Sequence, residues 1–221
     1  MEFVSAIKSQ AARFGSPRTG DGVAIFLPDF VQKISEEFRF VDLPKTSDDF
    51  NLTVGTVLQY GTFSGSIMSM LKIYSNGMIL EGPATTDVLD GALDRIEEIL
   101  LNSFNARVAS TDTITRLYVS QIEVKATAAA VRGLDELAAI RERLTGMVRA
   151  YGIQVDDYTI SGFSFGADPN LTPTDVKPGR FLFERRANRA FGDTIFFSDA
   201  PLRTGEHLAL LAELEATLIA E

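Results

Sequence analysis

The chain of 221 residues contains no cysteine and a single histidine, His207. Without cysteine it can form no disulfide, no thiolate metal site and no iron–sulfur cluster, and it has no thiol nucleophile. One histidine rules out a multi-histidine metal site, and any Ser-His-Asp arrangement would have to include His207. Because the sequence carries no recognisable catalytic or metal-binding signature, we predict no metal site, no cofactor and no catalytic residue.

Two further absences concern targeting and membranes. The first residues, 1–8, lack a basic segment followed by an apolar run, so we expect no secretory signal. No stretch approaches the ~18 uninterrupted apolar residues of a membrane span. Absence of cysteine fits a reducing compartment. We expect a soluble, cytoplasmic protein with no membrane partner.

Basic residues are fewer than acidic ones: the chain has 21 Lys and Arg against 30 Asp and Glu, and its formal net charge is −9. Nucleic-acid affinity comes largely from Lys and Arg that neutralise phosphates, so the overall charge opposes DNA or RNA as a partner. Hydrophobic residues make up 45% of the chain and charged residues 23%, which is ordinary globular usage. A chain of this length can bury a sizeable core.

The amino-terminal segment predicts a helix followed by a loop. Val4, Ile7, Ala11 and Phe14 follow helical spacing within residues 2–14. Residues 15–22 are rich in Gly and include a Pro, a composition that breaks regular structure. We therefore expect residues 1–28 to form an N-terminal helix with a flexible Gly/Pro loop, and residues 29–221 to form a single α+β domain.

Periodicity in the rest of the chain predicts an α+β fold. Apolar residues alternate or cluster in strand-like segments at 50–60, 66–74, 78–80, 117–126, 158–165, 180–186 and 194–198. Apolar stripes at helical spacing, with N-cap residues or terminal glycines, mark helices at 86–104, 134–151 and 204–218. We expect a mostly antiparallel sheet, or sheets, with about three main helices packed on it.

A possible internal repeat relates residues 29–110 to residues 111–221. A shift of 118 residues superimposes residues at break, cap and core positions: Pro83 on Pro201, Thr86 on Thr204, Leu93 on Leu211, Glu97 on Glu215, and Leu100 on Leu218. This predicts two related hairpin-plus-helix lobes. The alternative is that two unrelated strand-to-helix corners use the same residue types to cap their helices.

Four arginines form the first candidate ligand site. Arg185, Arg186 and Arg189 lie close together near the end of a predicted strand, and Arg203 occupies the next corner. A guanidinium binds phosphate or carboxylate through its planar fork, so these residues could gather an anionic ligand. The alternative is structural, with Arg185 at a strand end reaching solvent or pairing with an acidic neighbour.

His207 belongs to a second candidate site, the strand-to-helix corner at residues 198–207. The corner brings Ser198, Asp199, Arg203 and His207 within ten residues, next to helix N–H groups that could hold an anion. His207 also precedes Leu210, Leu211, Leu214 and Leu218 at helical spacing. The alternative is therefore a core histidine that makes one hydrogen bond.

A third pattern, Glu123-x-Lys125 on a predicted strand, occurs in metal-dependent nucleases, where the carboxylate holds an ion. Here it would need a partner such as Asp29 or Asp112. The alternative is an exposed strand face with solvated charges.

Three functional hypotheses follow. The leading one is a non-enzymatic protein that acts through protein–protein interaction, as a subunit of an assembly or as a homo-oligomer. The alternative is a binding module for a small anionic, nucleotide- or phosphate-like ligand held by Arg185, Arg186, Arg189, Arg203 and His207. The second alternative is a carboxylate-based, metal-dependent hydrolase or nuclease.

Overall fold

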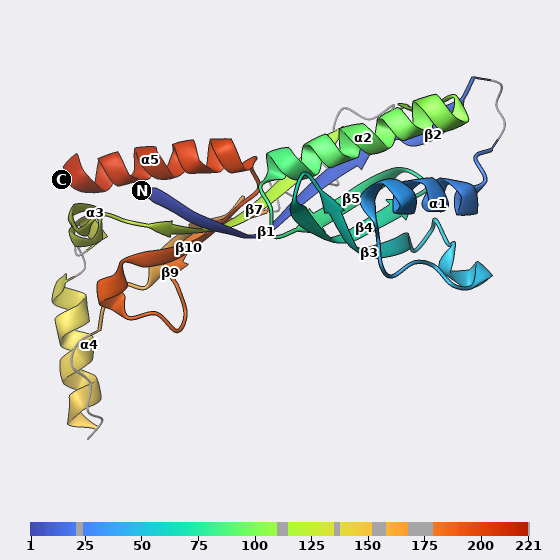
Figure 1. The fold of residues 1–221 in the computed structure, drawn as a ribbon. Helices are drawn as coiled ribbons and strands as arrows, with labels where there is room; N and C mark the ends of the chain where they lie inside the picture. Colours follow the sequence, from blue (N-terminus) through green and yellow to red (C-terminus); the bar gives the residue numbers. More distant parts are fainter. Residues whose placement is uncertain (21–23, 110–114, 135–137, 152–157, 168–178, 221) are drawn as a thin grey trace. The chain divides into compact units, whose positions relative to one another are not determined.

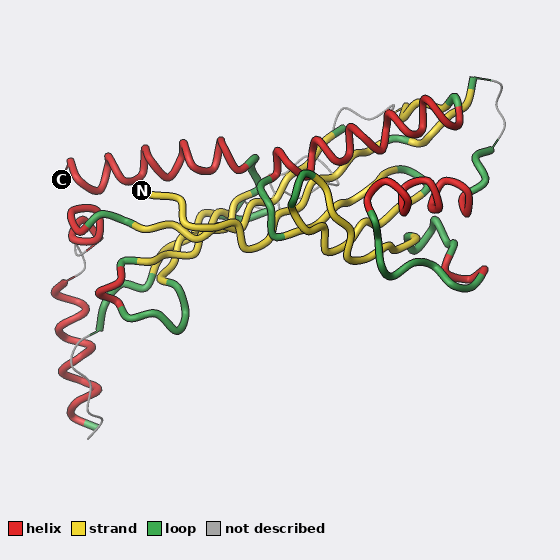
Figure 2. The backbone as a smooth tube through the Cα atoms, in the orientation of Figure 1, coloured by secondary structure: helices red, strands yellow, loops and turns green. Residues whose placement is uncertain are grey.

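The computed structural model describes residues 1–20, 24–109, 115–134, 138–151, 158–167 and 179–220, which form an α+β fold (Figures 1 and 2). The strands are β1 Glu2–Phe14, β2 Ser16–Thr19, β3 Thr56–Phe63, β4 Ser66–Tyr74, β5 Gly77–Gly82, β6 Ala106–Ala109, β7 Arg116–Lys125, β8 Gly162–Phe165, β9 Phe181–Arg185 and β10 Ile195–Ala200. The helices are α1 Leu27–Phe38, α2 Thr86–Phe104, α3 Ala128–Gly133, α4 Ala138–Ala150 and α5 Thr204–Ala220, with 3-10 turns at Ser47–Asp49 and Phe191–Asp193.

Eight strands form one large sheet in the order β3-β4-β5-β1-β7-β10-β9-β8, and β2 pairs with β6 in a separate two-stranded sheet. Adjacent strands such as β1 and β5, or β3 and β4, run antiparallel. The predicted α+β class and the antiparallel character of the sheet are confirmed. Within the described residues no helix is both long and apolar enough to cross a membrane.

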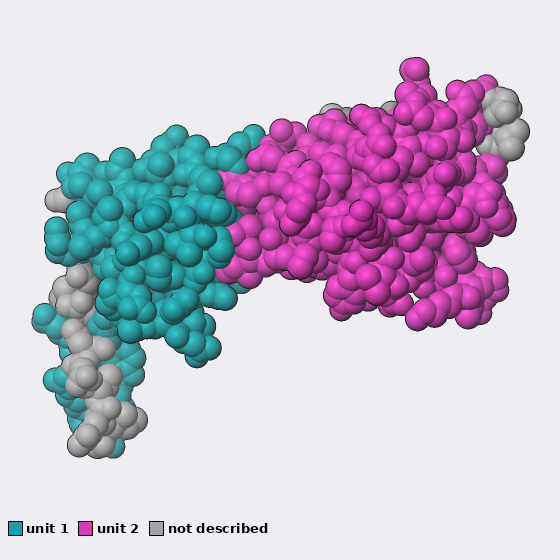
Figure 3. Space-filling view, in the orientation of Figure 1, with its two compact units in different colours: residues 1–5, 122–200, 205–221 teal, residues 6–121, 201–204 magenta. Residues whose placement is uncertain are grey.

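The chain divides into two compact units (Figure 3). Unit 1 comprises residues 1–5, 122–200 and 205–221, and unit 2 comprises residues 6–121 and 201–204. Strands β1 and β7 each contribute residues to both units.

Unit 2 has its core between one face of the sheet and helices α1 and α2. Apolar residues of α1 pack beside α2, as shown by the edge-to-face contact of Phe30 with Phe104 at 5.7 Å between ring centroids. Phe38 at the end of α1 contacts Phe63 of β3. The core side chains on the strands include Leu58, Leu71 and Leu80, all fully buried. Removal of this apolar surface from water is the main force that holds the helices on the sheet.

Unit 1 has a smaller, aromatic core. Phe183 of β9 and Phe196 of β10 stack with ring centroids 4.5 Å apart. Gly133 at the end of α3 lies so close to α5 that a Cβ there would be 2.0 Å from the carbonyl oxygen of Leu218. A larger residue at position 133 would therefore push α3 away from α5.

The predicted N-terminal helix is wrong, because residues 2–14 form the long strand β1. Its core-facing residues alternate as Ser9, Ala11 and Arg13, which are 0%, 0% and 3% exposed. Two of these three are polar, so a hydrophobic pattern does not reveal the period of two. The predicted flexible loop is also wrong over residues 16–19, which form β2 and pair with β6.

The expectation of about three main helices is wrong as well, since the described residues contain five. Helix α1 is the main omission, although Pro28 in its first turn and the apolar positions Phe30, Ile34 and Phe38 favour a helix. The predicted strand at residues 50–60 begins only at Thr56. Helices α2 and α5 and strands β7, β9 and β10 lie where the sequence predicted them, within a few residues.

Candidate functional site

The most concentrated group of charges lies in unit 2 around Arg13. Its guanidinium, 4% exposed, forms an ion pair with Asp90 of α2 and donates to Asp94 at 2.6 Å. Its Nε lies 3.4 Å from the carboxylate of Glu97. The three carboxylates follow one another at helical spacing, so one face of α2 receives the arginine from β1.

Asp90 is the centre of this group. Tyr118 donates a hydrogen bond to it at 3.0 Å, and guanidinium nitrogens of Arg116 and Arg203 each lie 3.5 Å from its other oxygen. Burial opposes ionisation of Asp90, but the hydrogen bonds and charges of Arg13, Tyr118 and Arg116 outweigh it and hold its pKa below the ordinary value. Asp90 is thus a carboxylate that the fold keeps ionised.

The pKa of Glu97 is shifted in the opposite direction. Its burial disfavours the charged form more strongly than the charge of Arg13 favours it, and Asp94 adds repulsion, so the pKa of Glu97 lies above its ordinary value. The two carboxylates, about two helical turns apart on α2, therefore differ in how readily they accept a proton.

Beside this group, the amino-terminal ends of α2 and α5 cap each other. The backbone N–H of Thr86 donates to the hydroxyl of Thr204 at 3.0 Å, and the N–H of Thr204 donates to the hydroxyl of Thr86 at 2.7 Å. Ser120 of β7 adds a hydroxyl contact at 3.4 Å. Both threonines are buried, so these bonds supply acceptors for helix N–H groups that no water reaches.

Arg203, one of the predicted ligand residues, is part of this unit 2 group. It donates to the hydroxyl of Tyr118 at 2.8 Å and places its guanidinium over the Tyr118 ring, 4.7 Å from the centroid. The structure therefore joins Arg203 to Asp90, whereas Arg185, Arg186, Arg189 and His207 belong to unit 1.

Arg185 is engaged by the backbone around it. Its guanidinium donates to the carbonyl of Ile160 at 3.2 Å and to the carbonyl of Phe191 at 3.0 Å. It also lies over the rings of Phe191 and Phe196, at 4.5 and 5.2 Å from their centroids. Carbonyl and aromatic contacts of this kind help to stabilise an arginine on an apolar face.

The other two arginines of that segment have separate surroundings. Arg186 forms an ion pair with Glu123 of β7 at 3.5 Å and lies over the ring of Phe197. The side chain of Arg189 is exposed in the turn after β9. The anion-binding interpretation stays a prediction.

Glu123, the proposed nuclease carboxylate, also accepts a hydrogen bond from Ser5 at 3.3 Å. Lys125 is exposed at the end of β7, and Asp29 lies in the first turn of α1. Asp112 lies outside the described residues. In the described part of the chain, no group of three or more His, Asp or Glu side chains is placed to share a metal ion.

His207 is fully buried at the start of α5, with its Nε2 2.8 Å from the hydroxyl of Ser198 on β10. Ser198 donates its only hydroxyl hydrogen to the carbonyl of Leu182 at 2.8 Å, so the imidazole Nε2 must donate to Ser198. A general base would have to accept that proton instead. The pair is therefore arranged as a buried hydrogen-bond chain that links α5 to two strands.

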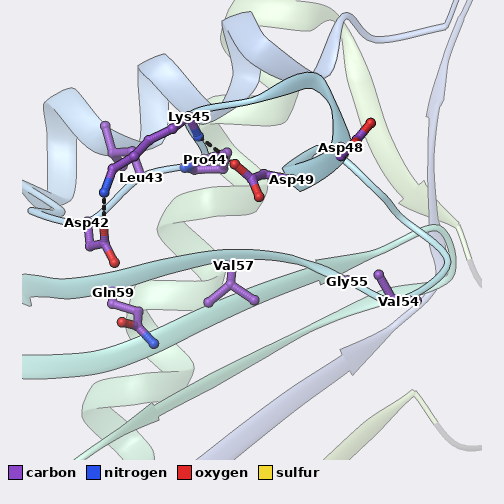
Figure 4. Close-up of a pocket in the computed structure, with 10 residues that line it drawn as sticks. All are labelled: Asp42, Leu43, Pro44, Lys45, Asp48, Asp49, Val54, Gly55, Val57 and Gln59. Carbon is purple, nitrogen blue, oxygen red and sulfur yellow. Dashed lines mark hydrogen bonds and ion pairs between the residues drawn. The ribbon is translucent and has the colours of Figure 1, made fainter.

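A pocket of about 440 Å³ opens in unit 2 between β3 and the segment at residues 42–49 (Figure 4). Its lining residues come from both sides: Asp42, Leu43, Pro44, Lys45, Asp48, Asp49, Val54, Gly55, Val57 and Gln59. Asp49 accepts hydrogen bonds from the N–H groups of Thr46 and Lys45 and from the Thr46 hydroxyl, and these bonds lower its pKa. Three carboxylates and one ammonium group make the pocket negative.

Gly55 shapes the strand side of this pocket. Its φ of +95° favours glycine, and a Cβ there would collide with the side chain of Lys72. The sharp turn at Gly55, closed by its N–H donating to the carbonyl of Asn51, allows β3 to begin at the pocket wall.

A second groove, of about 380 Å³, lies between α2 and β6. Its lining residues are Asp94, Glu97, Glu98, Leu101, Ala106, Arg107 and Val108. Because Asp94 and Glu97 are also partners of Arg13, this groove is the solvent-facing side of the charge group already described.

No protein-family model matches the chain, and a search of curated proteins finds no significant similarity.

Sequence reasoning missed Arg13, Asp90 and the pocket at β3. Arg13 and Asp90 are 77 residues apart, and the incorrect helix prediction placed Arg13 on the wrong type of element. The matching positions of Thr86 and Thr204 were the one available signal, and these residues do meet in the structure.

Proposed function

We propose that the chain is a non-enzymatic protein that acts by binding another polypeptide chain, as a subunit of an assembly or as a homo-oligomer. The observation that carries this proposal is a group of large apolar side chains left exposed at an edge of the sheet in unit 2. Val41, Tyr60 and Ile67, here called the β3 edge patch, are 79%, 59% and 55% exposed.

The three residues are neighbours in the pairing register. An isolated bridge joins Asp42 to Gln59, which brings Val41 beside Tyr60. Thr62 pairs with Ile67, so Tyr60 and Ile67 are diagonal neighbours on adjacent strands. Contiguous apolar exposure at a strand edge is typical of surfaces that another chain covers.

Tyr60 adds a backbone feature to the patch. Its φ of +59° lies in the left-handed region, which is uncommon for an aromatic residue inside a strand. Such conformations are retained where the surroundings or a function require them. Here the conformation coincides with an aromatic side chain that points out of the fold at the edge of the sheet.

The test is measurement of mass in solution and residue-resolved cross-linking in native cells. We expect a self-associated species, or a cross-linked partner at the β3 edge patch, that is lost in Ile67→Asp. Ile219→Asp is the matched control, because Ile219 is 50% exposed on α5 in unit 1. A strictly monomeric protein with no cross-link at this patch would count against the proposal.

A further inference from the structure

We propose that the pocket beside β3 is a strand-addition site, in which a short, extended, basic segment of a partner protein pairs with the outer edge of β3 at Val57. This proposal rests on the proposed function and specifies its mode of binding and the chemistry of the partner. It depends on three features of unit 2: the direction of the Val57 backbone groups, the shape of the pocket and the charge of its wall.

The direction of the Val57 backbone follows from Gln59. Gln59 donates its N–H to the carbonyl of Asp42 at 2.9 Å, and its carbonyl accepts from the N–H groups of Val41 and Asp42 at 3.1 and 3.2 Å. Both polar groups of Gln59 therefore point away from β4. In an antiparallel strand this direction repeats every second residue, so the N–H and C=O of Val57 also point outward.

Among the described residues, none continues this outward backbone pairing at Val57. The segment that pairs with Gln59 turns away after Asp42, and the pocket of about 440 Å³ opens between it and Val57. In Figure 4 residues 43–49 lie on one side of this space and Val54, Gly55 and Val57 on the other. A segment that entered here would extend the pairing that Val41 and Asp42 begin.

The negative charge of the residues that line the pocket favours a basic peptide segment. The wall carries three carboxylates, those of Asp42, Asp48 and Asp49, and one ammonium group, that of Lys45, which pairs with Asp42 at 3.0 Å. Asp48 is exposed on the 3-10 turn. Leu43, Pro44 and Val54 add apolar surface. An extended peptide with valine-like side chains on one face and Lys or Arg on the other complements this wall, since alternate residues of a strand point to opposite faces.

The first test uses amide hydrogen exchange measured by NMR on the full chain. In the free protein we expect fast exchange at the Val57 amide and slow exchange at the Leu58 amide, which points towards β4. The probe is a blocked heptapeptide that alternates valine and lysine. It should slow exchange at Val57 by about tenfold or more, the effect expected of one added hydrogen bond. The same peptide with glutamate in place of lysine should leave Val57 unchanged.

Proline substitution tests the backbone directly. Val57→Pro removes the outward N–H and should leave a folded protein that no longer binds the lysine peptide, because proline is tolerated where an edge N–H faces outward. Leu58→Pro is the matched control and should unfold the protein. If Val57→Pro is also unfolded, the outward direction of its N–H, and with it the proposal, is wrong.

Charge is tested with Asp48→Asn, which should weaken binding of the lysine peptide by about threefold to tenfold at low salt and much less at high salt. Asp193→Asn, an equal change of charge at an exposed position in unit 1, should have no effect. Equal affinities for the lysine and glutamate peptides would overturn the basic character of the occupant.

The outcomes separate this inference from the proposed function. If Val57 exchanges slowly in the free protein or is not protected by the lysine peptide, strand addition fails, whereas an effect of Ile67→Asp on assembly would leave the proposed function intact. If Val57 is protected simply by raising the concentration of the protein itself, the occupant is a second copy, and the basic peptide is excluded. Loss of both effects removes both proposals.

Discussion

At the scale of single residues, the most closely spaced charges of unit 2 are those around Arg13. A buried guanidinium is tolerated only where carboxylates surround it, and removal of one partner leaves the others uncompensated. The burial of Arg13 lowers its pKa, but the hydrogen bonds to Asp90 and Asp94 raise it further, and the net direction is upward. The guanidinium of Arg13 therefore stays charged at neutral and acid pH.

We predict that Asp90→Asn destabilises the protein by roughly 3 kcal/mol at pH 7, as expected when one member of a buried ion pair is removed. Thermal unfolding should show a loss of about 2–4 °C for each kcal/mol in a chain of this size. The matched control is Asp87→Asn, one turn earlier on α2 at an exposed position, with little effect expected.

The stability difference between wild type and Asp90→Asn should be smaller in acid than at neutral pH. The pKa of Asp90 is lower in the folded protein than in the unfolded chain, where it is about 3.9. Its stabilisation is therefore present above that value and is lost as the pH falls towards the folded pKa. The gap in unfolding free energy between wild type and Asp90→Asn should shrink below about pH 4; a constant gap would contradict this assignment.

The contribution of Glu97 to stability has the opposite pH dependence to that of Asp90. Because burial raises its pKa, the ionised side chain is disfavoured by the folded state, and stability falls as the pH rises through the folded pKa. Glu97→Gln should therefore raise the midpoint of thermal unfolding at pH 7 and lose that advantage in acid. Glu98→Gln is the control, since Glu98 is exposed and pairs with Arg95. A lower midpoint for Glu97→Gln would show that its ion pair with Arg13 dominates.

At the scale of secondary-structure elements, the first residues of α2 and α5, Thr86 and Thr204, cap each other's helix. Two amino-terminal ends carry partial positive charge and would repel each other. Exchange of hydroxyl acceptors between Thr86 and Thr204 offsets that cost by satisfying both N–H groups. The same two residues define the repeat offset of 118, although the repeat itself stays a prediction.

We predict that Thr86→Val and Thr204→Val each cost about 1 kcal/mol, the usual effect of a lost N-cap acceptor. The double variant should cost less than the sum, because each hydroxyl acts on the other helix and the pair shares its bonds. Chemical denaturation of the four proteins measures the coupling. Strict additivity would mean that the two caps act independently.

The hydrogen-bond chain at the start of α5 gives another element-scale prediction. Ser198→Ala removes the hydroxyl that accepts from the buried Nε2 of His207 and should cost about 1–3 kcal/mol. Ser164→Ala, at an exposed position on β8, should cost almost nothing. Stability of Ser198→Ala equal to wild type would show that His207 obtains another partner for that nitrogen.

At the scale of the whole molecule, strands β1 and β7 each contribute residues to both units. We predict one cooperative unfolding transition. Tryptophan probes at Tyr60 in unit 2 and Phe191 in unit 1, both exposed, should report the same midpoint in urea. Separate midpoints would show that the units unfold independently.

The sequence by itself determined what local patterns can encode. Caps and apolar stripes located α2 and α5, and short apolar runs located β7, β9 and β10, because spacing and capping depend on neighbouring residues. The absence of cysteine is enough to exclude disulfides, thiolate metal sites and thiol nucleophiles. The spacing of His207 with the leucines of α5 likewise predicted its burial.

Only the tertiary structure decided the rest. Ser9 and Arg13 of β1 are polar by type, yet both are buried, and Asp90 of α2, far along the chain, compensates the charge of Arg13. The pocket at Val57 likewise depends on which strand forms the edge of the sheet and where its neighbour turns away. Such features arise from contacts between distant residues, and no local period of the sequence records them.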